Sequence, residues 1–339
     1  MSSSPAPLEL PFPVLVGDIG GTNARFAQLD APDADLHIFP TAATADYADP
    51  AEAIEAVVFK DDKIRPKTLI FALAGPVTGD RIKLTNCPWV FAPHDLIARL
   101  GVENVILLND FEAQALALPS LGPKDLQKIG GGDVLPEATM AVIGPGTGLG
   151  VGILAHAVGK WIPIPGEGGH VNLAAETKRD LEIWPHLVGV EGRITAESVI
   201  SGPGMLNLYN AVSRANGHEP VYHKPADITA PASADDPEVK ETLALFGKHL
   251  GALAGDLALT ALARGGVFIG GGVSQHIAST LESGPFRAAF EAKPPHRALT
   301  TSIPTFLIMH PMPALIGLAA YASHPDNFGV DLKGRHWLK

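Results

Sequence analysis

Cysteine is almost absent from this sequence, which carries a single one, Cys87, among 339 residues. One cysteine cannot form an intramolecular disulfide, and it cannot supply a cysteine-rich zinc site. The sequence therefore gives no indication of an oxidising compartment. We expect Cys87 to be a small, half-buried side chain.

Positive charge is also scarce. Lysine and arginine number 25 against 36 aspartates and glutamates, which gives a formal net charge of -11. Nucleic acids and anionic membranes bind proteins that present a basic face. We therefore expect neither as a partner, whereas a phosphorylated small molecule is still allowed at a locally positive site.

Long apolar runs and a targeting segment are missing as well. The most apolar late segment, 303–321, is interrupted by Pro304, Pro311 and Pro313, which makes it a poor transmembrane helix. The N-terminus, MSSSPAPLELPFP, has neither the positive region nor the apolar region of a signal peptide. These observations predict a cytoplasmic protein.

Length and composition predict a globular α/β protein with two domains, because a single core stops growing at roughly 250 to 300 residues. Apolar runs between turn residues predict strands, and periodic patterns with Pro or Gly at their ends predict helices. In the first part, we expect strands at 13–16, 25–29, 68–74, 82–84 and 104–108, and helices at 51–59, 94–100 and 110–118. After a loop at 121–133, we expect strands at 140–143, 151–158, 161–164, 267–270 and 305–309, and helices at 178–187, 196–200, 204–215, 237–263 and from Pro313. Hairpins followed by crossovers indicate mixed sheets with helices packed on them.

Three glycine loops follow predicted strands, at 17–23, 144–150 and 270–272. Glycine lets backbone amides approach a ligand closely, and successive amides suit phosphate oxygens. The first two loops also carry a threonine, Thr22 and Thr147, that can donate to phosphate. Together the loops favour a nucleotide site over three unrelated turns.

Two other kinds of nucleotide site fit less well. The Walker pattern GxxxxGK[ST] is not met at Lys160 or at Lys248. A GxGxxA pattern occurs at 150–155, but VGK follows it as a short turn, so we interpret this segment as the second arm of a hairpin.

Asp18 ends the first strand beside its glycine loop. Phosphates that have no P-loop lysine need Mg²⁺, which prefers a carboxylate plus waters. We expect Asp18 to serve it, directly or through water. The alternative is an Asx-type bond to its own turn, which is common.

Asn109 and Asp110 stand between a strand and a helix. Ligands of α/β sheets lie outside the carboxyl ends of strands, so Asp110 is placed to accept a proton from an attacking hydroxyl. The alternative is that Asn109 or Asp110 only caps the helix.

Glu167 and His170 are separated by two glycines, which we interpret as a flexible turn rather than a helix face. A metal site is conceivable, but further ligands are lacking nearby. Hydrogen bonding to vicinal hydroxyls fits better. Glu197 is a third candidate, with a solvated or capping helix residue as its alternative.

The combination resembles the bacterial glucokinase family of the hexokinase, actin and heat-shock chaperone superfamily, and not the zinc-containing ROK branch. The resemblance rests on segments in matching order: GDIGGTNAR (17–25), LNDFEA (108–113), GPGTGLG (144–150), PGEGGH (165–170), AESVISGPG (196–204), GGVFIGGGV (265–273) and SGPFRAAFEAK (283–293). It implies a two-lobed, ribonuclease H-like or actin-like ATPase fold, with a mixed sheet in each lobe and a cleft between them. It also implies phosphorylation of the 6-hydroxyl of glucose by ATP with Mg²⁺, and a homodimer.

The resemblance also implies roles for individual residues. Asp110 would be the general base. The sugar would be held by Asn109, Asp110, Glu167, His170 and Glu197. The nucleotide would be bound by Asp18, Gly20, Gly21, Thr22, Asn23, Gly144, Gly146, Thr147, Gly148, Gly270, Gly271 and Gly272. Asp18 would hold Mg²⁺, and Arg25, on the returning strand, would be structural.

The implied domains are a small one, residues 1–120 plus 311–339, and a large one, residues 121–310. A kinase of broader hexose or amino-sugar specificity is the main alternative, because sequence spacing cannot separate glucose from mannose. A sugar-responsive repressor and an NAD-dependent oxidoreductase are weaker alternatives. The first lacks room for a DNA-binding extension before the first strand, and the second rests on the GxGxxA letters alone.

Overall fold

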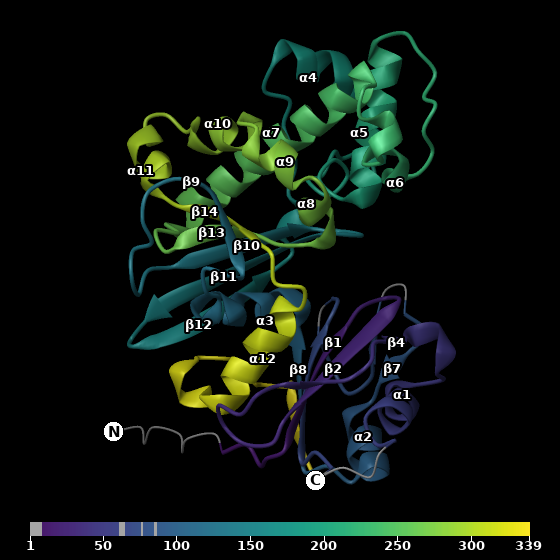
Figure 1. Ribbon diagram of the computed structural model, residues 1–339, viewed down its shortest axis with the longest axis vertical. Coiled ribbons are helices and arrows are strands. Elements are labelled where there is room, and N and C mark those ends of the chain that lie inside the picture. Colours follow the sequence, from purple (N-terminus) through teal and green to yellow (C-terminus); the bar gives the residue numbers. More distant parts are fainter. Residues whose placement is uncertain (1–8, 61–64, 76, 85–86) are drawn as a thin grey trace. The chain divides into compact units, whose positions relative to one another are not determined.

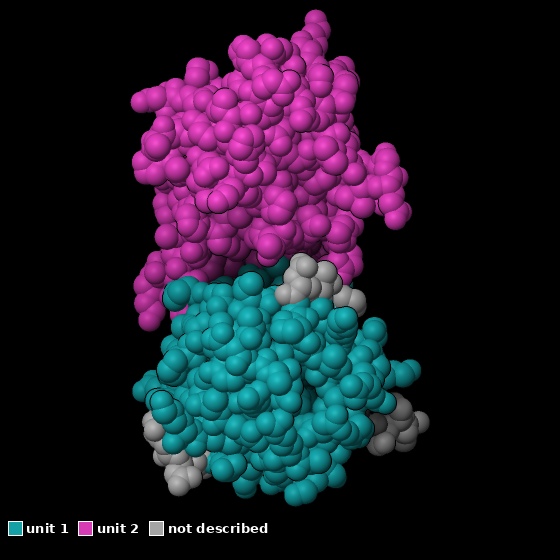
Figure 2. All heavy atoms as spheres, turned by 90° about the vertical axis from the view of Figure 1, so that its right-hand side faces the viewer, with its two compact units in different colours: residues 1–121, 154–165, 311–339 teal, residues 122–153, 166–310 magenta. Residues whose placement is uncertain are grey.

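The structure is a computed structural model, and it describes residues 9–60, 65–75, 77–84 and 87–339. The chain forms two compact units, coloured teal and magenta in Figure 2. Unit 1 contains residues 1–121, 154–165 and 311–339, and unit 2 contains residues 122–153 and 166–310. The domain limits given above stay a prediction. The start of the N-terminal segment, for which no signal peptide is predicted, lies outside the described residues.

The first sheet is mixed, as predicted. Its strands follow the order β15-β8-β5-β1-β2-β3, with β4 paired to β2. Strands β1, β5 and β8 are parallel, whereas β2 and β15 run antiparallel to their neighbours. The bounds are Val14–Ile19 for β1, Asn23–Leu29 for β2, His37–Ile38 for β3, Ala42–Ala43 for β4, Thr68–Leu73 for β5, Asn104–Asn109 for β8 and His336–Leu338 for β15.

The second sheet repeats this arrangement in the order β12-β11-β10-β13-β14-β9. Strands β10, β13 and β14 are parallel, and β9 is an antiparallel edge. The bounds are Leu126–Gly130 for β9, Met140–Pro145 for β10, Leu149–Ala157 for β11, Lys160–Gly166 for β12, Gly266–Ile269 for β13 and Thr305–Ile308 for β14. A separate pair joins β6, Ile82–Lys83, to β7, Val90–Phe91. Five strands follow the same order in the two sheets, β3-β2-β1-β5-β8 in the first and β12-β11-β10-β13-β14 in the second, whereas the antiparallel edge strand comes last in the chain in the first sheet (β15) and first in the second (β9).

The predicted turn between β11 and β12 is confirmed. Val158 has φ 50° and Gly159 has φ 72°. Two consecutive positive φ angles are the signature of a type I′ hairpin turn, which matches the twist of the flanking strands. The GxGxxA letters therefore lie on a hairpin strand and open no helix.

In unit 1, two helices that are far apart in sequence pack together. Helix α12, Pro313–Ser323, lies beside α3, Asp110–Ala117 (Figure 1). A Cβ at Gly317 would lie 1.9 Å from the carbonyl oxygen of Ala113, so the close approach requires glycine. The remaining helices are α1, Pro50–Val57, and α2, Pro93–Leu100.

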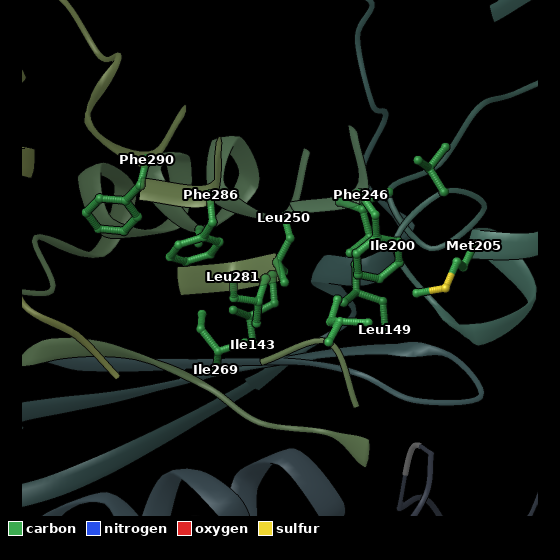
Figure 3. Packing of buried hydrophobic residues seen from close by; sticks show 14 of the residues in the cluster. Ile143, Leu149, Ile200, Met205, Phe246, Leu250, Ile269, Leu281, Phe286 and Phe290 are labelled. Carbon is green, nitrogen blue, oxygen red and sulfur yellow. The ribbon is translucent and has the colours of Figure 1, made fainter. Parts of the chain in front are cut away.

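In unit 2, α7 covers the second sheet. Figure 3 shows Phe246 and Leu250 of α7 on the side of the core opposite Ile143 and Ile269 of the sheet, and all four are fully buried. The helix bounds are Lys178–Ile183 for α4, Gly202–Ala215 for α5, Pro225–Ile228 for α6, Pro237–Ala261 for α7, Gly272–His276 for α8, Ala278–Glu282 for α9, Pro285–Glu291 for α10 and Arg297–Ser302 for α11. Among the described residues, none of the helices combines the length and the apolar character that a membrane span needs.

Two sequence-based expectations are wrong here. Residues 121–133 are not a loop throughout, because β9 pairs with β14 within them. The glycines that suggested a loop serve close packing, since a Cβ at Gly131 would lie 2.1 Å from the carbonyl oxygen of Ile303. Cys87 is 6% exposed and is therefore buried rather than half-buried.

Candidate active site

The carboxyl ends of three parallel strands form one edge of the first sheet. Ile19 of β1 pairs in register with Leu73 of β5, and Leu73 pairs with Asn109 of β8. The first glycine loop follows β1, and Asp110 follows β8. Because ligands of α/β sheets bind at this edge, the structure brings the loop and the predicted base to the same functional face of unit 1.

One hydrogen bond within the first glycine loop closes its turn, and Thr44 anchors the turn from a neighbouring segment. Gly20 donates its N–H to the carbonyl of Asn23 at 2.9 Å. Thr44, which follows β4, donates its N–H to the carbonyl of Thr22 at 2.9 Å and its hydroxyl to the carbonyl of Gly21 at 2.8 Å. The side chains of Thr22 and Asn23 are exposed at the tip. Sequence reasoning missed the support from Thr44, because β4 is too short to leave a pattern.

Asp18 pairs with Arg25 across the hairpin. The two residues are opposite each other in the register, and Nη1 of Arg25 lies 3.2 Å from Oδ2 of Asp18. Burial raises the pKa of Asp18, and the Arg25 charge opposes this shift. Within the described residues, the carboxylate therefore bonds a guanidinium and not an amide of its own turn. We expected a structural role for Arg25, and the structure shows its contact: Arg25 pairs with the predicted metal-binding carboxylate of Asp18.

Asn109 is the N-cap of α3. Its Oδ1 accepts from the N–H groups of Phe111 at 2.9 Å and Glu112 at 3.2 Å, and the Glu112 carboxylate accepts from the Asn109 N–H at 3.4 Å. Asp110 is the first residue of the helix, and its Oδ1 accepts from Nδ2 of Asn109 at 3.0 Å. The capping alternative thus applies to Asn109, whereas the Asp110 carboxylate is oriented beside the cap.

The second and third glycine loops meet at the corresponding edge of the second sheet. Ile143 of β10 pairs in register with Ile269 of β13, and each strand is followed by one of the loops. Gly271 has φ 78°, and a Cβ there would lie 2.3 Å from the carbonyl oxygen of Pro145. Only glycine allows this contact, so two of the loops predicted to bind the nucleotide are packed against each other.

The turn of the second glycine loop is tied to the start of α5. Gly146 donates its N–H to the carbonyl of Gly148, and Gly202 donates to the carbonyl of Gly146, both at 2.8 Å. Thr147 is exposed at the tip, as Thr22 is in the first loop. The N-cap of α5 is Ser201, whose hydroxyl accepts from Gly204 N–H at 2.9 Å. The Ser-Gly-Pro sequence at 201–203 indicates this helix start. The hydrogen bond between the helix start and the loop could not be predicted from the sequence.

Glu167 directly precedes a single turn of 3-10 helix, Gly168–His170, so this segment is a short helical turn rather than the irregular turn that we expected. The His170 N–H donates to the Glu167 carbonyl at 3.0 Å, and the side chains lie 3.8 Å apart, between Nε2 and Oε2. They are 55% and 66% exposed. Two exposed polar side chains on one side of a loop suit a hydroxylated ligand.

Glu197 lies in an irregular turn, so the helix predicted at 196–200 is wrong. The Ser198 hydroxyl accepts from the Thr195 N–H at 2.8 Å and donates to the Thr195 carbonyl at 2.7 Å. These local bonds compete with a helix ladder. The Glu197 carboxylate accepts from the Leu149 N–H at 2.8 Å, so this half-buried residue is bonded to a strand and is not part of a helix.

The five-strand order shared by the two sheets, with a glycine turn between β1 and β2 and another between β10 and β11, defines an α/β protein of the sugar kinase and actin-like ATPase class. The crystal structure of a glucokinase from an Antarctic psychrotroph has this fold, with a TM-score of 0.82 and 34% identity, over 91% of this chain and 98% of that one. A ROK family glucokinase from Streptomyces griseus shares the fold at a TM-score of 0.61 and 19% identity, over 91% of this chain and 98% of its own.

Sequence comparisons give the family. The model of the family described as Glucokinase matches residues 15–325. A glucokinase from Sinorhizobium fredii is 50% identical over 327 residues, which cover 96% of each chain. A glucokinase from Rhizobium johnstonii is 49% identical over 339 residues, which cover 100% of this chain and 99% of that one. The chain belongs to the glucokinase family, and the predicted family, fold and enzyme class are confirmed.

Proposed function

We propose that this protein transfers the γ-phosphoryl group of ATP to the 6-hydroxyl of glucose, with Asp110 as the general base. The observation that carries this assignment is that Asn109 and Asp110 have different roles at the start of α3. Asn109 satisfies the helix N-terminus, while the Asp110 carboxylate is held beside it at the ligand-binding edge of the sheet. Family membership supports the reaction, and this geometry supports Asp110 as the base.

The reaction needs one proton acceptor and one phosphoryl acceptor. The Asp110 carboxylate accepts the proton of the 6-hydroxyl as that oxygen attacks the γ-phosphorus. The new bond joins the sugar oxygen to phosphorus, the bond to the β,γ-bridging oxygen breaks, and ADP leaves. Asp110 holds the proton until it is lost to solvent.

The remaining predicted residues bind the substrates in this proposal. Asn109, Glu167, His170 and Glu197 position the sugar hydroxyls. The exposed Thr22 of the first loop donates to phosphate oxygens. The three glycine loops complete the nucleotide site, with the N–H groups of Gly20, Gly146 and Gly270 holding the loops in shape. The loop residues of this site are Gly20, Gly21, Asn23, Gly144, Gly146, Thr147, Gly148, Gly270, Gly271 and Gly272.

Mg²⁺ is part of the proposal, and Asp18 is its protein ligand. Among the described residues, no group of three or more His, Cys, Asp or Glu side chains could hold a metal ion. A single carboxylate with waters and phosphate oxygens is, however, the donor set that Mg²⁺ takes in kinases. When bound, Mg²⁺ offsets the charge of the phosphates. Asp18 would hold the ion directly or through water.

The sugar is proposed from the family and from two solved relatives of the same fold. The glucokinase structure from Balamuthia mandrillaris is a complex with glucose, and that of the ROK family glucokinase from Streptomyces griseus contains glucose and AMPPNP. We further propose a cytoplasmic homodimer, in line with the family resemblance.

A coupled ADP-release assay tests the function. Purified protein with Mg-ATP is given glucose, mannose, fructose, galactose or N-acetylglucosamine in turn. We expect much faster ADP release with glucose than with fructose, galactose or N-acetylglucosamine, and the rate with mannose measures how strict the preference is. The absence of glucose-dependent ADP release would overturn the proposal, and equal rates with several hexoses would favour the broader-specificity kinase.

A further inference from the structure

Glu197 connects two loops of unit 2 that are proposed to bind different substrates. Its N–H donates to the carbonyl of Gly169, in the segment 165–170 that carries Glu167 and His170, at 2.9 Å. Its carboxylate Oε2 accepts from the N–H of Leu149, the first residue of β11 after the second glycine loop's turn, at 2.8 Å. The main chain of Glu197 thus bonds the sugar loop, residues 165–170. Its side chain bonds the second glycine loop, residues 144–150, which is called the phosphate loop below.

Glycines make this double contact sterically possible. A Cβ on Gly148 would lie 2.6 Å from Oε2 of Glu197, which is closer than real Cβ atoms approach a neighbour. A Cβ on Gly169 would lie 2.1 Å from the carbonyl oxygen of Leu149. Both loops therefore lack side chains at the points where they meet each other and the carboxylate.

The two oxygens of the carboxylate have different surroundings. Oε2 is fixed by the Leu149 amide. Oε1 accepts no hydrogen bond from the residues that the structure describes, and Glu197 is only half-buried. A hydrogen bond to a charged acceptor is strong enough to favour one side-chain conformation, and this leaves Oε1 available to a ligand hydroxyl.

We infer that the phosphate loop positions Glu197 for the sugar, with the Leu149 amide as the contact and Gly148 as the positioning residue that leaves room for it. This inference rests on the proposed function, because it takes Glu197 to bind glucose. It follows that the conformation of the phosphate loop and the affinity for sugar are linked. By thermodynamic reciprocity, a nucleotide that holds this loop in place strengthens sugar binding, and sugar strengthens nucleotide binding by the same factor.

The substitution Gly148→Ala tests the link, because the added methyl displaces the carboxylate without removing any proposed sugar ligand. Glucose binding is measured by titration calorimetry in the absence and presence of AMPPNP. We expect the dissociation constant for glucose without nucleotide to rise about 10-fold, the size of one lost charge-assisted hydrogen bond. Unfolding midpoints verify that the variant is folded.

Gly146→Ala is the matched control for sugar affinity. It lies in the same turn, and its added Cβ would meet nothing within 4 Å. We expect wild-type glucose binding without nucleotide for this variant. Its turnover is not expected to match the wild type, since Gly146 is proposed to bind phosphate.

A double-mutant cycle shows whether Gly148 acts through Glu197. In a Glu197→Ala background there is no carboxylate to displace, so Gly148→Ala should have no further effect on glucose affinity. If Gly148→Ala weakened glucose binding only by distorting the fold, it would also weaken binding in the Glu197→Ala background. Glu197→Asp is an independent test that retains the charge but shortens the reach to the Leu149 amide. We expect it to bind glucose about as weakly as Glu197→Ala.

The outcomes separate this inference from the proposed function. If the wild type does not phosphorylate glucose, the proposed function fails. If the wild type is active but Gly148→Ala changes nucleotide binding alone, or Glu197→Asp binds glucose normally, the positioning role is overturned. Additive effects in the cycle would overturn it as well.

Discussion

Arg335 and Glu112 form a buried ion pair at the back of the proposed catalytic turn, with Nη1 and Oε2 2.6 Å apart. The Glu112 side chain is fully buried, and the Arg335 side chain is 14% exposed. Burial raises the pKa of Glu112, and the guanidinium opposes that shift. The carbonyl of Arg335 also accepts from the Leu107 N–H at 3.0 Å. The C-terminal segment is thereby fixed to the strand and helix that carry Asp110.

We predict that Arg335→Ala destabilises the protein by about 3–5 kcal/mol, because it leaves a buried carboxylate without a counter-charge. Adding Glu112→Gln should recover part of the loss, since a neutral amide is less costly to bury. Urea unfolding measures both effects. Arg81→Ala is the control, because its pair with Asp95 is 70% and 79% exposed and should have no measurable effect. An unchanged midpoint for Arg335→Ala would show that the pair is not important for stability.

We predict that Asp110→Asn lowers kcat by at least about 10²-fold while glucose binding largely survives. The amide retains the shape of the side chain and its position beside Asn109, but it cannot accept the proton. Steady-state kinetics and a glucose titration on the same sample separate the two quantities. Near-normal turnover would mean that another group is the base.

The strands that carry the proposed active site were predictable because their signals are local. An apolar run ending in a glycine loop specifies β1 and its turn, and the Asn109–Asp110 pair after β8 follows from the same reasoning. Edge elements were not predictable. β4 has only two residues and leaves no pattern, and β15 pairs with β8, which is far away in the chain. Thr44 and Arg335 were missed with these two strands.

The conformation and the contacts of Glu197 could not be predicted from the sequence either. Its residue type and the apolar positions around it are compatible with a helix, and the competing side-chain bond between Thr195 and Ser198 is visible only in the structure. The partner of its carboxylate is the main-chain N–H of Leu149, which leaves no trace in the sequence. Contacts to backbone groups are the part of this site that residue types cannot reveal.

Two glycines of α7 should respond in opposite directions to alanine. A Cβ at Gly251 would lie 2.0 Å from the carbonyl oxygen of Phe286 in α10, so Gly251→Ala should destabilise by about 1–3 kcal/mol. At Gly247 the nearest atom would be a methyl of Thr280 at 3.7 Å, an ordinary contact. Gly247→Ala should therefore stabilise the helix by about 0.5–1 kcal/mol. Thermal and chemical unfolding compare the two, and equal shifts would contradict the packing argument.

Asp180 is a buried carboxylate that the proposed reaction does not use. Its Oδ2 accepts from Lys248 Nζ at 2.7 Å and from the N–H of Thr177 at 2.9 Å, and Nε2 of His249 lies 3.4 Å from Oδ1. Burial by itself would raise the pKa of Asp180, but these neighbouring groups outweigh burial and hold its pKa well below the ordinary value. The carboxylate is therefore ionised in the folded protein at neutral pH and stabilises it.

We predict that Asp180→Asn costs about 3–5 kcal/mol at pH 7, because Lys248 loses its counter-charge in a largely buried pair. A depressed pKa in the folded state gives stability that is complete above the unfolded value of about 3.9 and is lost as pH falls through the folded value. The stability difference between wild type and variant should thus be constant from pH 7 to about 5 and narrow below about pH 4. Urea titrations at several pH values measure this difference. Asp235→Asn is the control, because Asp235 is fully exposed in its pair with Lys240. A wild-type advantage that stays constant far below pH 4 would contradict the assignment of this stability to the Asp180 charge.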